Sequence, residues 1–400
     1  MNWPHELLDS LTDRGSGHTP SQKHSEYWNG GIKWVSLSDS SALDKRYIYD
    51  TTKKISQLGL RHSSAVLHPK GTVILSRDAG VGKSAILGAE MAVSQHFIAW
   101  RCDEKRLHNE YLYQWLQLEK TEFERIATGS TVKTIGLGYF QKLRLPVPSI
   151  DVQRDIASAL DTWDAAIHTT DQLITAKEHI LAALRQRLFA RDVRKGFVRV
   201  RLDSIFKERQ ENSDGQSPVY SVSVRKGLVN QIEHLGRSFS AATTDHYSMV
   251  RPGDIVYTKS PTGDFPFGIV KQSRAHEDSI VSPLYGVFIP QRREIGTVID
   301  FFFESPANAR NYLRPLVQKG AKNTLSISND QFLQGVVTLP DESSAINRIA
   351  NLIDEARHEL SLLQSRLRLL KEQKQGLMQK LLTGQWRLSG HGATEETENA

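Results

Sequence analysis

Residues 346–381 read INRIANLIDEARHELSLLQSRLRLLKEQKQGLMQKL, the longest regular pattern in the chain. Steps of alternately three and four residues from Ile346 to Leu381 reach eleven positions, and ten of them are apolar, with Lys374 as the exception. Residues 341–383 contain no proline and one glycine, Gly376. A sustained heptad seam of this kind predicts one long helix that packs against another helix.

A second seam of equal length lies 193 residues earlier, at positions 153–188, where eight of eleven positions are apolar. Pro148 and Pro340 precede the two helices, because the residue before a proline resists helical geometry, and Gly384 is a suitable stop. One such stripe usually packs against a globular core, but two matched seams favour an antiparallel coiled coil between them. The predicted interface residues are the apolar seam positions Ile156, Leu160, Ile167, Ile174, Leu181, Leu184, Leu188, Ile349, Ile353, Leu360, Leu363, Leu367, Leu370, Leu377 and Leu381.

The regions outside the two helices also occur twice. Phe140 to Pro148 returns as Phe332 to Pro340, an offset of 192 residues. Residues 8–11, Leu-Asp-Ser-Leu, return as Leu-Asp-Ser-Ile at 202–205, an offset of 194. Each match is weak alone, but their common order and near-constant offset indicate a duplication. A period near 190 residues is a duplicated domain and not a solenoid repeat.

Each repeat opens with about 140 residues of short apolar runs separated by Gly, Pro, Ser and Asn. Four of these runs read as strands: Val73 to Leu75, Phe97 to Trp100, Ile255 to Tyr257 and Tyr285 to Ile289. Residues 109–126 and 306–319 read as short helices capped by Asn109 and Ser305.

We therefore predict an α+β fold with a pseudo-two-fold internal repeat. Two mixed α/β modules, residues 1–148 and 193–340, are joined by the helices 149–192 and 341–385. Residues 386–400 form a flexible acidic tail in this scheme. The length of 400 residues, which suggests two or three domains, agrees with it.

Composition and charge restrict the class of protein. The formal net charge is +6 and becomes +9 without the last twelve residues, which favours a polyanionic partner. No run of eighteen apolar residues exists, so a transmembrane helix is excluded, and the residues after Met1 form no apolar signal segment. The single cysteine, Cys102, allows no internal disulfide and no zinc–cysteine cluster, so a reducing, cytoplasmic location is expected.

The motifs that carry chemistry in enzymes are incomplete. Residues 80–84, Gly-Val-Gly-Lys-Ser, resemble part of a phosphate-binding loop, but Arg77 occupies the position of its first glycine. A surface loop between strands is the better interpretation. Residues 136–138, Gly-Leu-Gly, lack the third glycine of a dinucleotide site, and no His-Glu-x-x-His pattern is present. We assign no catalytic residue and no metal ligand.

Polar, basic and aromatic residues recur in similar places in the two modules. Lys and Arg neutralise phosphates, and Arg, Lys, Asn and Ser can read base edges in the major groove. Any one of these residues could instead lie in the core or on a solvated surface, but the two patches together favour DNA contact. The candidates are Lys23, Tyr27, Trp28, Lys33, Trp34, Ser36, Arg77, Lys83, Ser130, Thr131 and Lys133 in the first module, and Tyr220, Ser221, Arg225, Lys226, Tyr257, Lys259, Thr262, Lys322, Asn323 and Thr324 in the second.

With these features together, the sequence resembles the specificity subunit of a type I restriction–modification system over about residues 5–388. Four segments carry the resemblance: Gly-His-Thr-Pro-Ser at 17–21 with Tyr-Trp-Asn-Gly-Gly-Ile-Lys-Trp-Val at 27–35, the loop 76–83, Lys-Leu-Arg-Leu-Pro-Val-Pro at 142–148, and Leu-Met-Gln-Lys-Leu-Leu-Thr-Gly at 377–384. The second module departs from the pattern because its opening lacks the Thr-Pro-Ser and Tyr-Trp-Asn-Gly phrase.

The resemblance implies a subunit without catalysis or a cofactor of its own. Each module, as a target-recognition domain, would read one half of a split, asymmetric target in double-stranded DNA, and the conserved paired helices would set the length of the spacer. Two methyltransferase subunits would methylate adenine with S-adenosylmethionine, and two restriction subunits would use ATP and Mg to translocate and cut DNA.

Two other classes compete with this interpretation. One is an architectural or adaptor protein that uses its coiled coil to bind proteins and does not read DNA. The other, a stand-alone methyltransferase or nuclease, is disfavoured by the missing catalytic motifs.

Overall fold

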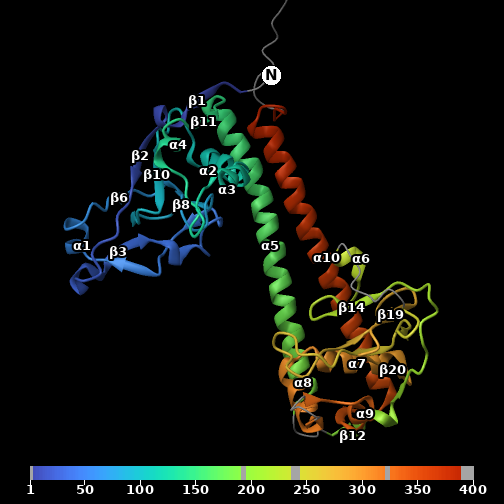
Figure 1. The fold of residues 1–400 in the computed structure, drawn as a ribbon. Helices are drawn as coiled ribbons and strands as arrows, with labels where there is room; N and C mark the ends of the chain where they lie inside the picture. The colour runs from blue at the N-terminus through green and yellow to red at the C-terminus, as the bar shows by residue number, and fades with distance from the viewer. Residues whose placement is uncertain (1–2, 191–194, 236–243, 320–324, 389–400) are drawn as a thin grey trace, which may run out of the picture. The chain divides into compact units, whose positions relative to one another are not determined.

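The computed structural model describes residues 3–190, 195–235, 244–319 and 325–388 (Figure 1). The chain divides into two compact units, Met1–Asp171 with Arg366–Ala400, and Gln172–Ser365. Each unit contains one globular module and a part of each long helix. The boundaries between the units therefore run through the helices, and the segment ends predicted from the sequence remain predictions.

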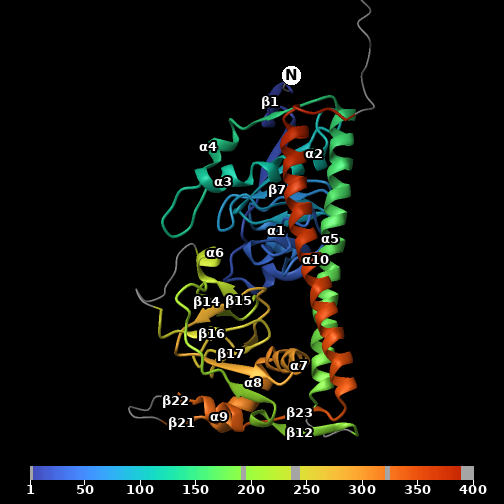
Figure 2. The same ribbon diagram turned by 90° about the vertical axis from the view of Figure 1, so that its right-hand side faces the viewer.

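The two long helices are α5, Ile150–Leu188, and α10, Ser343–Leu382. Within each unit they lie side by side in both views (Figures 1 and 2). In the first unit the Lys374 Nζ of α10 lies 2.6 Å from an Asp164 oxygen of α5, and in the second Lys177 Nζ lies 2.6 Å from a Glu359 oxygen. The partner's number falls along α10 as it rises along α5, so the pairing is antiparallel.

The seam faces inward along both helices. All fifteen predicted seam residues are buried or half-buried, whereas other apolar residues of the helices, such as Leu173, Ile180 and Leu362, are exposed. Near its ends the seam also joins the module cores: Leu160 and Leu381 belong to the core of the first module, and Ile353 to that of the second. The apolar stripe of each helix thus packs against the other helix and, near its ends, also against a module core.

The described part of the first module contains three sheets and four short α-helices. Strand β1 (His5–Leu7) pairs antiparallel with β11 (Arg144–Pro146), which closes the module beside the start of α5. The five-stranded sheet has the order β2 (Thr12–Ser16), β10 (Phe97–Cys102), β7 (Val73–Ser76), β8 (Ser84–Leu87) and β4 (Tyr47–Ile48). The four-stranded sheet has the order β5 (Lys53–Ile55), β3 (Trp28–Val35), β9 (Met91–Val93) and β6 (Leu67–His68). The helices are α1 (Gln57–Arg61), α2 (Asn109–Leu118), α3 (Lys120–Ile126) and α4 (Leu137–Phe140).

The second module follows the same plan. Strand β12 (Phe197–Arg201) pairs antiparallel with β23 (Val336–Pro340). Its main sheet has the order β13 (Phe206–Glu208), β20 (Gly286–Pro290), β17 (Ile255–Tyr257) and β18 (Val270–Gln272). Three two-stranded sheets add β14 (Tyr220–Ser223) with β15 (Gly227–Asn230), β16 (Ser248–Val250) with β19 (Ser279–Val281), and β21 (Gln318–Lys319) with β22 (Leu325–Ser326). The helices are α6 (Gln231–Leu235), α7 (Arg293–Phe303), α8 (Pro306–Leu313) and α9 (Asn329–Gln334).

The internal repeat is confirmed by this order of elements. The sheet β13-β20-β17-β18 matches β2-β10-β7-β8, and the pair of helices after β20 matches the pair after β10. The repeated phenylalanines explain why the sequence match survives. Phe140 packs against Trp100 in the first core, with ring centroids 5.9 Å apart, and Phe332 lies 4.8 Å from both Tyr257 and Phe288 in the second.

The local predictions have mixed outcomes. The four predicted strands are present, and the Ser305 cap is confirmed because its side chain accepts a hydrogen bond from the Asn308 N–H. The Asn109 cap was wrong: Asn109 is the first residue of α2, and its side-chain amide donates to the Gly71 carbonyl. The helix predicted over 109–126 is divided into α2 and α3, and that over 306–319 ends as α8 at Leu313, before a short 3-10 turn.

Candidate nucleic-acid interface

The loop between β7 and β8, residues 77–83, contains the first four residues of the surface loop predicted for 80–84, whereas Ser84 is buried at the start of β8. Gly80 and Gly82 have φ angles of +111° and +84°, which residues other than glycine rarely adopt. Lys83 Nζ donates to the Ser40 hydroxyl at 2.9 Å and lies 3.2 Å from its carbonyl oxygen. The ammonium group of Lys83 is therefore held against the module by Ser40, and the exposed part of the Lys83 side chain lies on the surface of the loop.

Asp78 joins this loop to two others. Its carboxylate lies 2.9 Å from His96 Nδ1, accepts a hydrogen bond from Thr134, and lies 3.5 Å from Arg77 Nε. Burial alone would raise the pKa of Asp78, but the hydrogen bonds from Thr134 and His96 and the charge of Arg77 hold the pKa below its ordinary value. We call residues 77–83, 94–96 and 128–134 the loop cluster.

Five candidates belong to the loop cluster. Ser130, Thr131 and Lys133 are exposed on its third loop, and Arg77 and Lys83 are half-buried on its first. Thr128 and Thr134 exchange backbone hydrogen bonds, and the Ile135 N–H donates to the Arg77 carbonyl, so the third loop is fixed beside the first. This part of the module can present cations and hydroxyls together on one surface, as contact with a DNA backbone requires.

A second group of candidates gathers around β3. The ring of Tyr27 stacks on those of His24 and His62, with centroids 4.8 and 5.6 Å away, and Lys53 Nζ lies 5.9 Å from the ring centroid of Trp28. We call these five side chains the aromatic cluster. Two other candidates lie close to it in the sequence: Lys23 is exposed, and Lys33 Nζ donates to the Tyr49 carbonyl at 2.5 Å.

Three candidates were wrong because their side chains are buried. The indole N–H of Trp34 and the hydroxyl of Tyr257 donate to backbone carbonyls inside their modules. Ser36 is also buried, and it forms a capping box with Asp39. The backbone N–H and the hydroxyl of Ser36 both donate hydrogen bonds to the Asp39 carboxylate. A buried side chain whose polar atoms are paired cannot contact DNA, so we remove these three residues from the candidate interface.

The candidates of the second module fall into two groups. Tyr220 donates from its hydroxyl to Glu277, and Ser221 accepts from Gln231 at 2.7 Å, so both are tied within β14 and its neighbours. Arg225 and Lys226 are exposed at the turn between β14 and β15.

The second group lies on the loop between β17 and β18. Lys259 is half-buried, and burial lowers its pKa, whereas Thr262 is exposed. Lys259 lines a small cavity with Val317 and Ile327, and Arg225 and Lys226 line a different one. Lys322, Asn323 and Thr324 lie outside the described residues.

Sequence reasoning missed His24, Lys53, His62 and His96. His96 and Asp78 are 18 residues apart and meet only because β7 and β10 pair. His62 reaches Tyr27 through the short helix α1, which the sequence pattern does not predict. No sequence motif predicts either contact, although bases can stack on aromatic side chains that gather beside basic ones.

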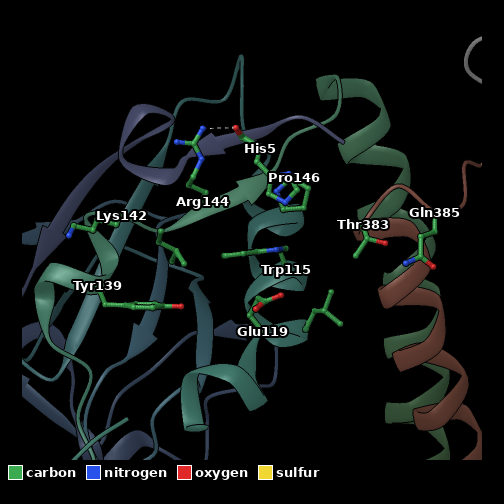
Figure 3. A pocket seen from close by; sticks show the side chains of 11 residues that line it. His5, Trp115, Glu119, Tyr139, Lys142, Arg144, Pro146, Thr383 and Gln385 are labelled. Atoms are coloured by element: carbon green, nitrogen blue, oxygen red, sulfur yellow. Dashed lines mark hydrogen bonds between the residues drawn. The ribbon is translucent and has the colours of Figure 1, made fainter. Parts of the chain in front are cut away.

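The first unit also contains a pocket of about 640 Å³ beside the last turn of α10 (Figure 3). Trp115, Glu119 and Tyr139 line it on the module side, and Thr383 and Gln385 on the helix side. Burial and the neighbouring Glu122 raise the pKa of Glu119. The carboxyl group of Glu119 is thus poorly solvated where it lines the pocket. No residue of the loop cluster lines this pocket.

Within residues 3–190, 195–235, 244–319 and 325–388, no group of three or more His, Cys, Asp or Glu side chains is placed to hold a metal ion. In the same part of the chain, no helix has the length and apolar character needed to span a membrane.

Comparison with known proteins relates the chain to one group. Residues 5–177 match the model of the type I restriction modification DNA specificity domain. The chain is 25% identical over 264 residues to the type I restriction enzyme MjaIX specificity subunit of Methanocaldococcus jannaschii, covering 61% of this chain and 60% of that protein. It is 22% identical over 169 residues to the EcoprrI specificity subunit of Escherichia coli, covering 40% and 41%. The matches thus span about half the length of these curated relatives.

Solved structures show the same fold. The S subunit of a type I restriction–modification system from M. genitalium superposes with a TM-score of 0.60 and 14% identity over 96% of both chains. A chain from a structure concerned with complex assembly and conformational transition of the type I R-M system gives a TM-score of 0.54 and 14% identity, over 96% of this chain and 98% of that one. These likenesses show that the chain has the fold of type I specificity subunits, and that residues 5–177 match the DNA specificity domain of that family.

Proposed function

We propose that this chain is the sequence-reading subunit of a type I restriction–modification complex, in which each module reads one half of a bipartite DNA target. One observation carries the proposal: the DNA specificity domain covers the first module, and the same order of sheet and helices recurs in the second. The loops that would face DNA differ between the modules, so they would read different half-sites.

The long helices supply a separation between the half-sites in this proposal. An α-helix of 39 residues, as α5 is, measures about 58 Å. Half-sites on one face of DNA lie about one helical turn apart, roughly 34–36 Å. A tilted coiled coil of this length is sufficient for that spacing, and its length would select the number of unspecified base pairs between the half-sites.

The proposal includes partners and excludes catalysis by this chain. Two methyltransferase subunits would bind the scaffold and methylate adenine with S-adenosylmethionine. Two restriction subunits would supply ATP- and Mg-dependent translocation and cleavage, and this chain would hold no cofactor. The complex would act in the cytoplasm, on double-stranded DNA.

A module exchange tests the reading of half-sites. Residues 1–145 are replaced by the recognition domain of another specificity subunit, and the methylated motif is determined with the methyltransferase partner present. We expect one half-site to change and the other to remain. Altered reading of both halves would contradict independent modules, and no dependence of methylation on this chain would favour the adaptor without DNA reading.

The spacer is tested separately. Four residues, about one helical turn, are inserted into both α5 and α10 at the boundary between the units. Each helix then lengthens by about 6 Å, which corresponds to roughly two base pairs of B-DNA. We expect a longer preferred spacer with both half-sites unchanged, and an unchanged spacer would refute the role of the helices.

A point substitution tests the loop cluster. Lys133→Ala removes an exposed cation from its third loop, and Lys105→Ala removes an exposed cation elsewhere in the same module. We expect Lys133→Ala to weaken DNA binding by the complex and to reduce the slope of log affinity against log salt by about one. The Lys105 variant should retain the wild-type slope, and equal slopes in all three proteins would remove the loop cluster from the interface.

A further inference from the structure

The second unit contains two adjoining cavities that share four lining residues, Arg225, Lys271, Arg274 and Glu304. The larger has a volume of about 660 Å³ and is bounded by the β14–β15 turn, by β18, and by the flanks of α5 and α10 that belong to this unit. We call the combined hollow the cationic cleft.

Positive charge exceeds negative charge in the cationic cleft. Of its described lining residues, six are Lys or Arg and three are Asp or Glu. Two of these carboxylates already form ion pairs with arginines. Glu304 binds Arg185 and Arg357, each at 2.6 Å, and Asp300 binds Arg357 at 2.9 Å and also Arg274. Even with Lys226 left out, the lining has five cationic side chains and three carboxylates, so positive charge remains in excess.

Lys271 is the deepest of these cations. It is 7% exposed and lines both cavities, and within the part of the chain that the structure describes its ammonium group has no hydrogen bond or ion pair. Two further buried donors of the lining, Arg185 Nε and Arg357 Nη1, have no acceptor among the described residues. Lys271 has only the longer-range charge of Asp300 to offset the hydration that it loses on burial, and the two buried arginine donors have no acceptor at all. An anion that enters the cleft would satisfy these donors.

We propose that the cationic cleft binds a small phosphate-bearing anion of the di- or triphosphate class. Several converging donors and an excess of positive charge suit a multiply charged phosphate better than a single carboxylate. The volume lies in the range of small-molecule sites, and Leu181, Leu360 and Val224 add an apolar wall. The backbone of a rigid duplex can reach the exposed Arg225, but Lys271 is accessible only to a ligand that enters. The inference does not depend on the proposed function.

The test measures anion binding to the full-length chain by isothermal titration calorimetry at constant ionic strength. Inorganic pyrophosphate and adenosine triphosphate are the two probes, so that the phosphate chain is separated from the base. We expect saturable binding of one anion per chain. Lys271→Met should weaken binding at least tenfold, and Lys207→Met, which removes an exposed lysine of β13 outside the cleft, should bind as the wild type does.

A second variant keeps the test decisive if Lys271→Met folds poorly. Arg225 is exposed at the rim, so Arg225→Gln should leave the fold intact and weaken binding severalfold. Three results would overturn the proposal: no saturable binding of either probe, equal binding by wild type and both cleft variants, or loss in these variants of duplex-DNA binding alone. The last result would make the cleft a contact for the DNA backbone.

Discussion

Asp300 is the most deeply buried charge in the second unit, and its removal gives a sharp prediction. Its exposed fraction is 0%, and it lies on α7. It accepts a hydrogen bond from the Gln272 N–H at 3.2 Å and pairs with Arg357 at 2.9 Å and with Arg274. Burial raises the pKa of Asp300, but the charges of Arg357, Arg274 and Lys271 outweigh burial and keep the pKa below its ordinary value. Asp300 therefore links β18, α7 and α10 as a carboxylate.

Asp300→Asn keeps the shape of the side chain and removes its charge. Breaking a buried ion pair costs about 3–5 kcal/mol, because the remaining charge is left without a partner. Arg274 is 46% exposed and can be rehydrated, and Arg357 retains Glu304 at 2.6 Å. We therefore expect a loss near the lower end of the range, about 3 kcal/mol.

The positions of the tryptophans decide which assay can report the stability of the second unit. All seven tryptophans, at positions 3, 28, 34, 100, 115, 163 and 386, belong to the first unit, so their fluorescence does not report the second. Native-state hydrogen exchange of peptides from α7 and β18 reports it directly. A loss of about 3 kcal/mol corresponds to exchange roughly 150-fold faster, and the fluorescence transition of the first unit should change little.

An exposed ion pair provides the control. Asp203→Asn removes the partner of Arg201 in the same module, and exposed pairs contribute about 0–1 kcal/mol. Exchange in α7 and β18 should therefore remain close to the wild-type rate. Acceleration of less than tenfold in Asp300→Asn, or equal acceleration in the control, would refute the role assigned to the buried carboxylate.

Three further predictions concern the seam, a helix cap and the loop cluster. Leu160→Ala, in the buried seam, should cost about 2–5 kcal/mol of unfolding free energy by denaturant titration, and Leu173→Ala, exposed on the same helix, less than about 0.5. Ser305→Ala should accelerate hydrogen exchange in α8 by the equivalent of about 1 kcal/mol, and Ser305→Asp should restore protection; unchanged exchange in the alanine variant would argue against the cap. The depressed pKa of Asp78 stabilises the folded state above the ordinary value of 3.8, and this stabilisation is lost as the pH falls below it. Asp78→Asn should flatten that acid dependence in a thermal melt, and an unaltered dependence would contradict it.

The long helices could be predicted because their signal is local and long. A seam that repeats over 36 positions identifies both the helix and its buried face, and the prolines at 148 and 340 limit its start. The sequence could not show that the same seam also enters the module cores near its ends. That depends on how α2 and α7 lie against the helices, which no period in the sequence encodes.

The modules could be predicted in outline only. Short apolar runs identify β7, β10, β17 and β20, but α7 is equally apolar and has no signal to separate it from a buried strand. Pairing between distant strands, such as the parallel contact of β3 with β9, depends on the tertiary fold. The duplication was visible in the sequence because the repeated core positions, such as Phe140 and Phe332, are under the same packing constraint.

The candidate interface was the least predictable part. Trp34 follows Lys33, and Tyr257 ends an apolar run two residues before Lys259; composition does not show which face of such a strand is buried. The loop cluster and the cationic cleft both depend on side chains that meet across elements, as Asp78 meets His96 and Arg225 adjoins Lys271. A sequence pattern gives the residue types at such a site but does not show which of them contact one another in the folded chain.

Adenine-methylation mapping of the whole genome, in cells with and without this gene, tests whether this chain reads DNA sequence. We expect a bipartite motif, with two specified halves and a fixed unspecified spacer, that is methylated in the first strain and unmethylated in the second. An identical methylation pattern in both strains, with the partner methyltransferase expressed, would contradict the assignment of sequence reading to this chain.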